Sequence, residues 1–190
     1  MDYKMNRTPS SYTSELHGEI TEKFAPILVE RRLKKGEIVH EIGKVCPHLY
    51  LVKSGILRAF YFKDGRDITA HFAFAKEAIT APDSFILGKP SKYSLESLED
   101  SHVLAVDHRQ LEVFLEENPH LEKLTRQFTQ AIYLELLERL ESIVFLTAKE
   151  RYEQLLKRNP NLLLGVNLGH TASYLGITQE TLSRIRAKQD

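Results

Sequence analysis

The chain has 190 residues, enough for one ordinary core or for a domain of about 120 residues beside a smaller one. Its 26 basic and 26 acidic side chains balance, so any nucleic-acid binding must come from a local patch. The single cysteine, Cys46, excludes an internal disulfide and argues against an iron–sulfur cluster, which usually takes about four thiolates. No run of about 18 apolar residues occurs, so we expect a cytoplasmic protein that does not contact a membrane.

The N-terminal part is predicted to hold a lead-in and one short helix. Residues 1–15 are mostly polar, and we expect them to be flexible. Apolar residues three and four positions apart predict a helix over 16–29, with a break near Pro26.

From residue 32 to residue 107 the chain divides into short β-prone runs separated by turn residues. The runs are 38–40, 49–52, 56–62, 68–74, 93–98 and 102–106. Strands at such regular spacing predict an antiparallel sandwich or barrel, which we place within residues 16–118. The run 56–62 with Asp64 and Gly65 behind it is the clearest hairpin, because Asp-Gly accepts the backbone angles of a tight reversal.

A cap at Asp107 opens a helix, and a longer helix follows from Pro119. The longer helix carries an apolar stripe of about six turns, which could pack on the barrel alone or pair with the same helix of a second copy. Further apolar residues widen the stripe to two faces, which favours both arrangements at once. We therefore expect a dimerisation helix over 119–146. Its expected contact residues are Leu121, Leu124, Phe128, Ile132 and Leu136.

Residues 147–190 are predicted to form a helical DNA-binding domain. Thr147 and Glu150 have the spacing of a capping box, which predicts a new helix through residue 158 and a domain boundary at 146–147. Residues 168–185 have the pattern of a helix-turn-helix.

That pattern rests on a few positions. Ala172 is the small residue where the two helices cross, and Gly176 can take the positive φ of the tight turn. Apolar residues fall on the inward faces, while Thr171 is polar where an aliphatic residue is expected. The alternative is a short helical hairpin that closes a domain.

Polar side chains project from the start of the second helix, which Thr178 can cap. The expected DNA-contacting residues are Thr178, Gln179, Glu180, Ser183, Arg184, Arg186 and Lys188. From Arg151 onward, six basic side chains stand against three acidic ones. This surplus suits phosphate contacts by a dimer and is too small for tight binding by a monomer.

The order of barrel, long helix, capped helix and helix-turn-helix resembles the Crp/Fnr family of bacterial transcription regulators. Segments 33–39, 49–55 and 64–68 are similar to the barrel signatures of that family, and 175–185 is similar to its recognition segment. The resemblance implies an α+β protein without enzymatic activity that binds double-stranded DNA as a homodimer, with RNA polymerase as a further partner. It places Arg184 where a guanine can be read, and Glu180 where a cytosine can.

Relatives that bind cyclic AMP carry a Gly-Glu pair for the ribose and, further on, an Arg followed by a small hydroxyl residue for the phosphate. The equivalent stretch 79–95 has neither in place, so a cyclic phosphate loses its bidentate partner. Lys92 could substitute as a point charge. We expect a barrel that does not bind cyclic AMP and holds another small ligand or none, with no cofactor. The candidate pocket residues are Thr80, Ala81, Lys92, Tyr93 and Ser94.

The family commonly adds a β-hairpin wing after the recognition helix, and the sequence up to Asp190 leaves no residues for one. We therefore expect fewer phosphate contacts and greater reliance on Arg186 and Lys188.

Three other functions remain as alternatives. A histidine metal site in the barrel is disfavoured because no ligand spacing links its histidines, which are His40, His48, His71 and His102. Cys46 could serve a redox or haem sensor, although a lone cysteine near a turn is usually inert. The main alternative is a dimeric ligand-sensing or protein-interaction module with a vestigial helix-turn-helix.

Overall fold

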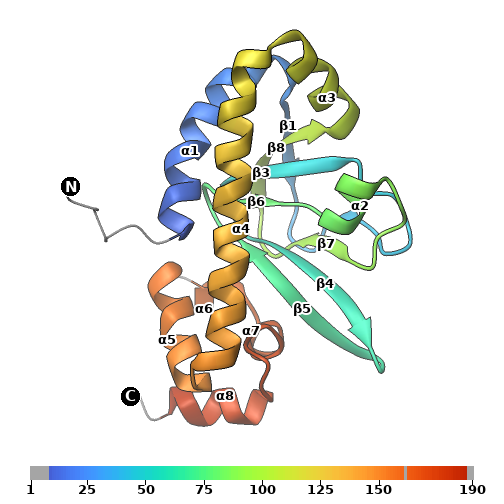
Figure 1. The fold of residues 1–190 in the computed structure, drawn as a ribbon. Helices are drawn as coiled ribbons and strands as arrows, with labels where there is room; N and C mark the ends of the chain where they lie inside the picture. The colour runs from blue at the N-terminus through green and yellow to red at the C-terminus, as the bar shows by residue number, and fades with distance from the viewer. Residues whose placement is uncertain (1–8, 161, 188–190) are drawn as a thin grey trace, which may run out of the picture.

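The computed structural model describes residues 9–160 and 162–187. A β-sandwich with flanking helices comes first, a long helix runs down its side, and a group of short helices lies at the far end of that helix (Figure 1). The chain is thus α+β, as predicted. Within the described residues, no helix combines the length and the apolar composition that a membrane span needs.

Two antiparallel sheets of four strands build the sandwich. The first has the order β1 (Val29–Leu33), β8 (Ser101–Asp107), β3 (His48–Ser54) and β6 (Ala78–Ile79). The second has the order β2 (Ile38–His40), β7 (Ser94–Ser97), β4 (Leu57–Lys63) and β5 (Arg66–Ala73). Tyr50 and Val103 from the first sheet meet Leu57 and Leu95 from the second in one buried cluster. Side chains from both sheets therefore fill the space between them.

The hairpin of β4 and β5 has the predicted turn. Asp64 and Gly65 have φ of 51° and 72°. Positive φ at both central residues is the geometry that matches the twist of the two strands, and Asp and Gly accept it at little cost.

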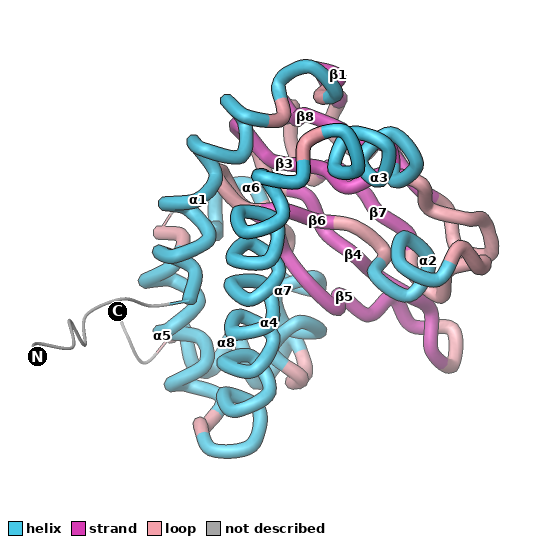
Figure 2. Tube along the Cα trace, turned by 45° about the horizontal axis from the view of Figure 1, so that its top comes forward, coloured by secondary structure: helices cyan, strands magenta, loops and turns pink. Residues whose placement is uncertain are grey.

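Helices α1 (Pro9–Lys23) and α4 (Glu122–Phe145) cover the outer face of the first sheet and run beside each other in both views (Figures 1 and 2). Leu16, Ile20 and Phe24 pack with Leu51 of β3 and with Phe128 of α4. The 3₁₀ turns η1 (Ala25–Ile27) and η2 (Pro119–Leu121) and the helix α3 (His108–Glu117) complete this layer. The short helix α2 (Pro82–Leu87) lies between β6 and β7 in the chain.

The predicted N-terminal boundaries need correction. Residues 9–15 belong to α1 and are not a flexible lead-in, because Thr13 and Leu16 are buried in the α1 layer and proline is tolerated in the first turn of a helix. Residues 1–8 of that lead-in lie outside the described residues. The helix ends at Lys23, and Val29 already belongs to β1.

The predicted dimer contact is also wrong in part. Leu121, Leu124 and Phe128 are each 6% exposed and pack against α1 and the first sheet, so they are not available to a second copy. Ile132 is partly buried in the same cluster. Of the five predicted contact residues, Leu136 alone is well exposed, at 55%. The apolar spacing correctly indicated a buried face, and α1 is what covers it.

The C-terminal helices are α5 (Ala148–Arg158), α6 (Leu162–Gly165), α7 (Leu168–Leu175) and α8 (Gln179–Arg186). The predicted capping box opens α5, with Thr147 N donating to Glu150 Oε2 at 2.8 Å and Glu150 N donating to Thr147 Oγ1 at 3.3 Å. The cap at Asp107 is confirmed as well, since its carboxylate accepts from Arg109 N and Gln110 N.

Candidate nucleic-acid interface

Helices α7 and α8 meet in a tight turn at Gly176. Gly176 has a φ of 69° and a ψ of 33°, the left-handed region in which glycine is least strained. Ile177 N donates to Ala172 O at 3.0 Å and closes the turn. The backbone of the predicted helix-turn-helix is therefore confirmed.

Side chains cap both helices of this element. Asn167 Oδ1 accepts from His170 N at 2.8 Å at the start of α7. Thr178 Oγ1 accepts from Thr181 N at 3.2 Å at the start of α8, as predicted. Because these bonds satisfy amides that have no partner inside the helix, they fix the direction in which each helix begins.

The two helices share a buried core with α5. Ala172, Leu175 and Leu182 are at most 1% exposed and lie in one cluster with Tyr152 and Leu155. The remaining apolar residues of the pattern are partly buried against this cluster: Leu168, Ile177 and Ile185. The core holds α7 and α8 in a fixed relative position.

Two residues of α7 fit this packing in ways the sequence did not reveal. A Cβ on Gly169 would lie 2.8 Å from Nε2 of Gln179, so the glycine leaves room for that side chain. Thr171, polar where an aliphatic residue was expected, is fully buried and donates from its hydroxyl to Asn167 O at 3.2 Å. That bond satisfies the hydroxyl within its own helix.

The predicted reading residues that the structure describes are all exposed, and the amide of Gln179 lies against α7 at Gly169. Those at exposed positions of α8 and its cap are Thr178, Gln179, Glu180, Ser183, Arg184 and Arg186. Within residues 9–160 and 162–187, none of Glu180, Arg184 and Arg186 forms an ion pair. Lys188 lies outside the described residues. Glu180, Arg184 and Arg186 can therefore contact a groove of DNA without breaking an ion pair between described residues.

Two of the six basic residues counted for phosphate contact have other partners. Arg151 donates to Leu175 O at 3.0 and 3.2 Å and to Leu146 O at 2.6 Å. Arg158 makes a bidentate pair with Glu77 at 2.9 and 2.6 Å. Arg151 joins α5 to the end of α7, and Arg158 attaches α5 to the barrel, which leaves fewer cations for DNA than the count suggested.

Helix α7 packs on strand β5. Thr69 N donates to Ser173 Oγ at 3.1 Å, and the rings of Phe72 and Tyr174 lie 4.9 Å apart. His170 Nε2 is 3.9 Å from Asp67 Oδ2. The first helix of the helix-turn-helix is thus fixed to the barrel, while α8 remains free on its outer side.

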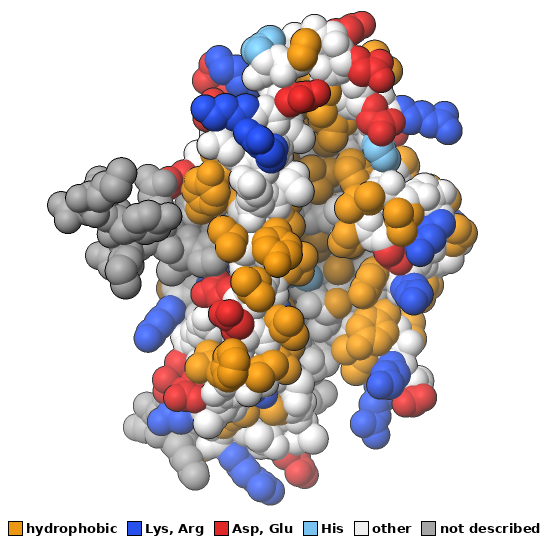
Figure 3. Space-filling model, in the orientation of Figure 1, with side chains coloured by type: hydrophobic (Ala, Val, Ile, Leu, Met, Phe, Trp, Pro, Cys, Tyr) orange, Lys and Arg blue, Asp and Glu red, His pale blue; other side chains and the backbone are white. Residues whose placement is uncertain are grey.

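The C-terminal half of α4 carries an exposed apolar face (Figure 3). Its members are Tyr133, Leu136, Leu140, Ile143 and Val144, each more than half exposed. They recur at helical spacing, so they lie along one side of the helix. No described residue covers this face, and we call it the α4 apolar face. A contiguous apolar surface of this kind is typical of an interface with another protein chain.

The five candidate pocket residues lie around α2, and most make contacts within the fold. Ala81 is fully buried at the N-cap of α2 and belongs to the buried cluster between the two sheets. Tyr93 packs against that cluster. Thr80 Oγ1 donates to His48 O at 2.8 Å, and Ser94 Oγ accepts from Ile42 N at 2.9 Å. Lys92 is exposed.

Asp83 lies beside the candidate pocket residues. Asp83 accepts from Ser91 Oγ at 3.1 Å and from Lys92 N at 3.2 Å. A carboxylate thus takes the local donors, which does not suit an anionic ligand.

Comparison with known proteins agrees with this architecture. Residues 30–118 match the family model of the cyclic nucleotide-binding domain. FixK2 from Bradyrhizobium japonicum superimposes with a TM-score of 0.69 at 20% identity, covering 85% of this chain and 84% of that one. The c-di-GMP-responsive global regulator CLP of Xanthomonas campestris gives 0.69 at 16% identity, with coverages of 90% and 91%.

A third structure, from Eubacterium rectale, is assigned to the Crp/Fnr family of transcriptional regulators. It gives a TM-score of 0.66 at 21% identity and covers 90% of this chain and 82% of that one. Residues 30–118 are thus similar to the cyclic nucleotide-binding domain, and the chain has the fold of Crp/Fnr structures. The resemblance expected from the sequence is thereby confirmed at the level of the fold. No curated protein matches the chain in sequence.

The histidines and the cysteine of this Crp/Fnr fold are dispersed. The described residues contain no group of three or more His, Cys, Asp or Glu side chains placed to hold a metal ion. Burial lowers the pKa of His40, and burial together with Arg158 and Arg139 lowers the pKa of His71 to about 3. Cys46 is buried at 1% exposure, so solvent does not reach its thiol.

Proposed function

We propose that the protein is a sequence-specific DNA-binding transcription regulator of the Crp/Fnr type that acts as a homodimer. The observation that carries the proposal is the exposed polar row of α8 on a closed helix-turn-helix. Capping, turn and core account for most other residues of this element, whereas Gln179, Glu180 and Arg184 are exposed. Their side chains can form the paired hydrogen bonds by which base edges are distinguished.

The α4 apolar face supports the homodimer. A second copy packing its own α4 there would bury the exposed leucines of both chains in a parallel pair. Dimerisation places two recognition helices on one side of the assembly, where they can occupy half-sites about 34 Å apart. It also doubles the cations available for phosphate contact, of which each chain offers few.

We further propose that the barrel does not bind cyclic AMP. Arg58 is the arginine that the described part of the barrel buries, at 3% exposure, and Asp67, Glu96 and Thr69 accept its hydrogen bonds. A cyclic phosphate would have to displace two carboxylates to reach it. Asp83 beside the candidate pocket opposes an anion as well.

Selection of duplexes from a random library at near-physiological salt tests the DNA part of the proposal. We expect an enriched motif with two-fold symmetry, since each half would be read by one α8. Enrichment of an asymmetric single site would contradict the homodimer. If neither the protein alone nor the protein with a cell extract enriched any motif, the vestigial alternative would be favoured.

Calorimetric titration with cyclic AMP tests the barrel. We expect no saturable heat, because the buried guanidinium is already paired. Saturable binding would show that this part of the proposal is wrong, and it would leave the DNA part standing.

A further inference from the structure

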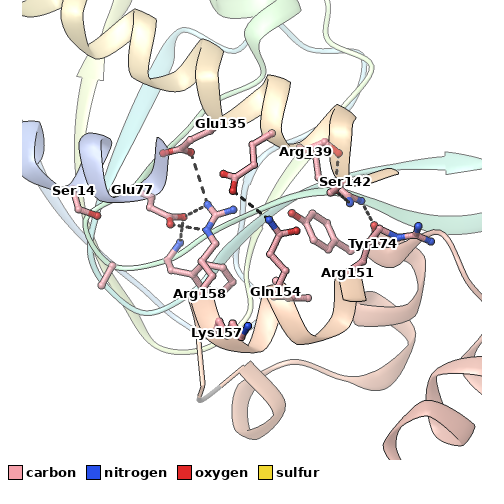
Figure 4. A pocket seen from close by; sticks show the side chains of 14 residues that line it. Ser14, Glu77, Glu135, Arg139, Ser142, Arg151, Gln154, Lys157, Arg158 and Tyr174 are labelled. Atoms are coloured by element: carbon pink, nitrogen blue, oxygen red, sulfur yellow. Dashed lines mark hydrogen bonds and ion pairs between the residues drawn. The ribbon is translucent and has the colours of Figure 1, made fainter. Parts of the chain in front are cut away.

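A cavity of about 450 Å³ lies where the barrel, α4 and the C-terminal helices meet (Figure 4). Buried Phe74, Leu155 and Tyr174 form part of its wall, and acids of α4 and of the β5–β6 turn face basic residues of α4 and α5. We call it the junction cavity. It is separate from the outer side of α8 and from the residues around α2.

The guanidiniums of the junction cavity already have acceptors in the protein. Arg139 lies over the ring of Tyr174 at 4.0 Å and donates to the carbonyl oxygen of the same residue. Arg151 donates to two carbonyl oxygens, and Arg158 pairs with Glu77. These groups are therefore poorly placed to receive an anion from outside. Lys157 is exposed at the rim.

The acids of α4 are less completely paired. The side chain of Glu135 is 10% exposed, and its Oε2 is 3.8 Å from Arg158 Nη2. Its Oε1 is buried and accepts no hydrogen bond from any described residue. Glu138 accepts from Gln154 through Oε1 at 3.2 Å. A buried carboxylate oxygen without a donor costs free energy, which a suitable donor would recover.

The surroundings of Glu135 agree with a missing donor. Burial is the main cause that raises the pKa of Glu135, and the neighbouring carboxylates of Glu77 and Glu138 raise it too. The side chain of Thr13 and the charge of Arg158 lower this pKa only in part, since that guanidinium is directed at Glu77. A further positive group beside Oε1 would stabilise the ionised carboxylate.

We propose that the junction cavity binds a small organic cation, an alkylammonium or guanidinium compound, whose N–H groups donate to Glu135 and Glu138. The aliphatic part of such a compound can pack on Leu155 and the ring of Tyr174. A bare metal ion fits less well, because the described residues offer no cluster of three ligands and Arg158 lies next to Glu135. The proposal does not depend on DNA binding.

Calorimetric titration of the full chain with putrescine and with agmatine, in a buffer free of amines, tests the site. We expect saturable binding of at least one probe. Glu135→Gln should weaken it about tenfold or more, as expected for the loss of a charge-assisted hydrogen bond. Glu141→Gln is the matched control, because Glu141 is on the same helix and exposed. The affinity of the Glu141→Gln variant for the probe should equal that of the unchanged chain.

Glu138→Gln is a second variant should Glu135→Gln fail to give folded protein, as judged by circular dichroism. Absence of saturable binding of both probes would overturn the proposal, as would equal affinities in the Gln variants and the unchanged chain. Saturable binding of free phosphate in place of the amines would also overturn it. None of these outcomes bears on the DNA selection, so the two proposals fail separately.

Discussion

The side chains of Arg184 and Gln179 are exposed at the start of α8. Replacing both with alanine should leave the free energy of unfolding nearly unchanged, because both are exposed at the start of α8. Affinity for the selected duplex should fall by about 1–3 kcal/mol for each base-reading side chain that is removed. Fluorescence anisotropy with a labelled duplex measures the weakening, and urea unfolding checks the stability.

Two matched variants separate base reading from general attraction to phosphate. Arg186→Ala should lower the affinity for the selected duplex and for a scrambled duplex to the same extent. Lys123→Ala removes an exposed cation at the other end of the molecule and should change neither affinity. Undiminished affinity in the Gln179/Arg184 double variant would count directly against α8 as the reading helix.

At this scale the sequence predicted what depends on near neighbours. The Thr147 box, the Asp107 and Thr178 caps and the positive φ of Gly176 each involve residues within a few positions of one another. Thr171 appeared anomalous because the acceptor of its hydroxyl is a backbone carbonyl, which no side-chain pattern reveals.

Among the elements, α4 separates into two halves with different environments. Its first half contacts α1 and the first sheet, and its second half carries the α4 apolar face. The stripe of leucines looks the same in both halves. Periodicity shows that a face is apolar, but not which surface covers it, so the sequence could not distinguish the two.

Leu136→Glu combined with Leu140→Glu should give folded monomers. Each leucine is more than half exposed in the single chain, so the charges cost little there. Across a dimer interface, losing the burial of the two side chains should cost about 3 kcal/mol or more, a weakening of more than about a hundredfold. Sedimentation velocity at micromolar concentration measures the association.

Leu124→Glu is the contrasting variant. Leu124 is 6% exposed and buried within one chain, so a charge there should reduce the free energy of unfolding itself.

An unchanged chain that sediments as a monomer at all concentrations would rule out the homodimer.

The strands that sequence reasoning missed have weak patterns for identifiable reasons. Strand β1 reads Val-Glu-Arg-Arg-Leu, and Leu33 alone of its side chains is buried, as is common at a sheet edge. Strand β6 has two residues. Strands with an alternating or continuous apolar run, such as β3 and β4, were predicted close to their observed ends.

For the molecule as a whole, the pair of Arg158 and Glu77 connects the C-terminal helices with the barrel. Arg158→Met should lower the free energy of unfolding by about 3 kcal/mol, because Glu77 is 6% exposed and would lose its cationic partner, keeping the N–H of Phe74. Urea unfolding measures the change. Arg184→Met removes an exposed arginine and is the control with little expected effect.

A double variant distinguishes pairing from packing. Glu77→Gln together with Arg158→Met should be more stable than Arg158→Met alone, since no buried charge is left without a partner. Strict additivity of the two single effects would show that the ion pair does not hold the two parts together.

The junction cavity could not be predicted from the sequence. Glu77, Glu135 and Arg158 are far apart in the chain and have the composition of an ordinary solvated surface. Arg158 meets Glu77 because α7 packs on β5 and α5 packs on α7, and α4 brings Glu135 beside them. Such long-range placement follows from the complete fold, whereas the helix-turn-helix follows from 18 consecutive residues, 168–185.

One helix, α4, carries both the α4 apolar face and the acids of the junction cavity, on adjacent sides. A side chain lies about 6 Å from the axis of an α-helix, so turning α4 by about 20° moves it by about 2 Å. That displacement is enough to break a hydrogen bond. Any torsion imposed on α4 by a second copy would therefore reach Glu135 and Arg139, and through Arg139 the backbone of Tyr174 in α7.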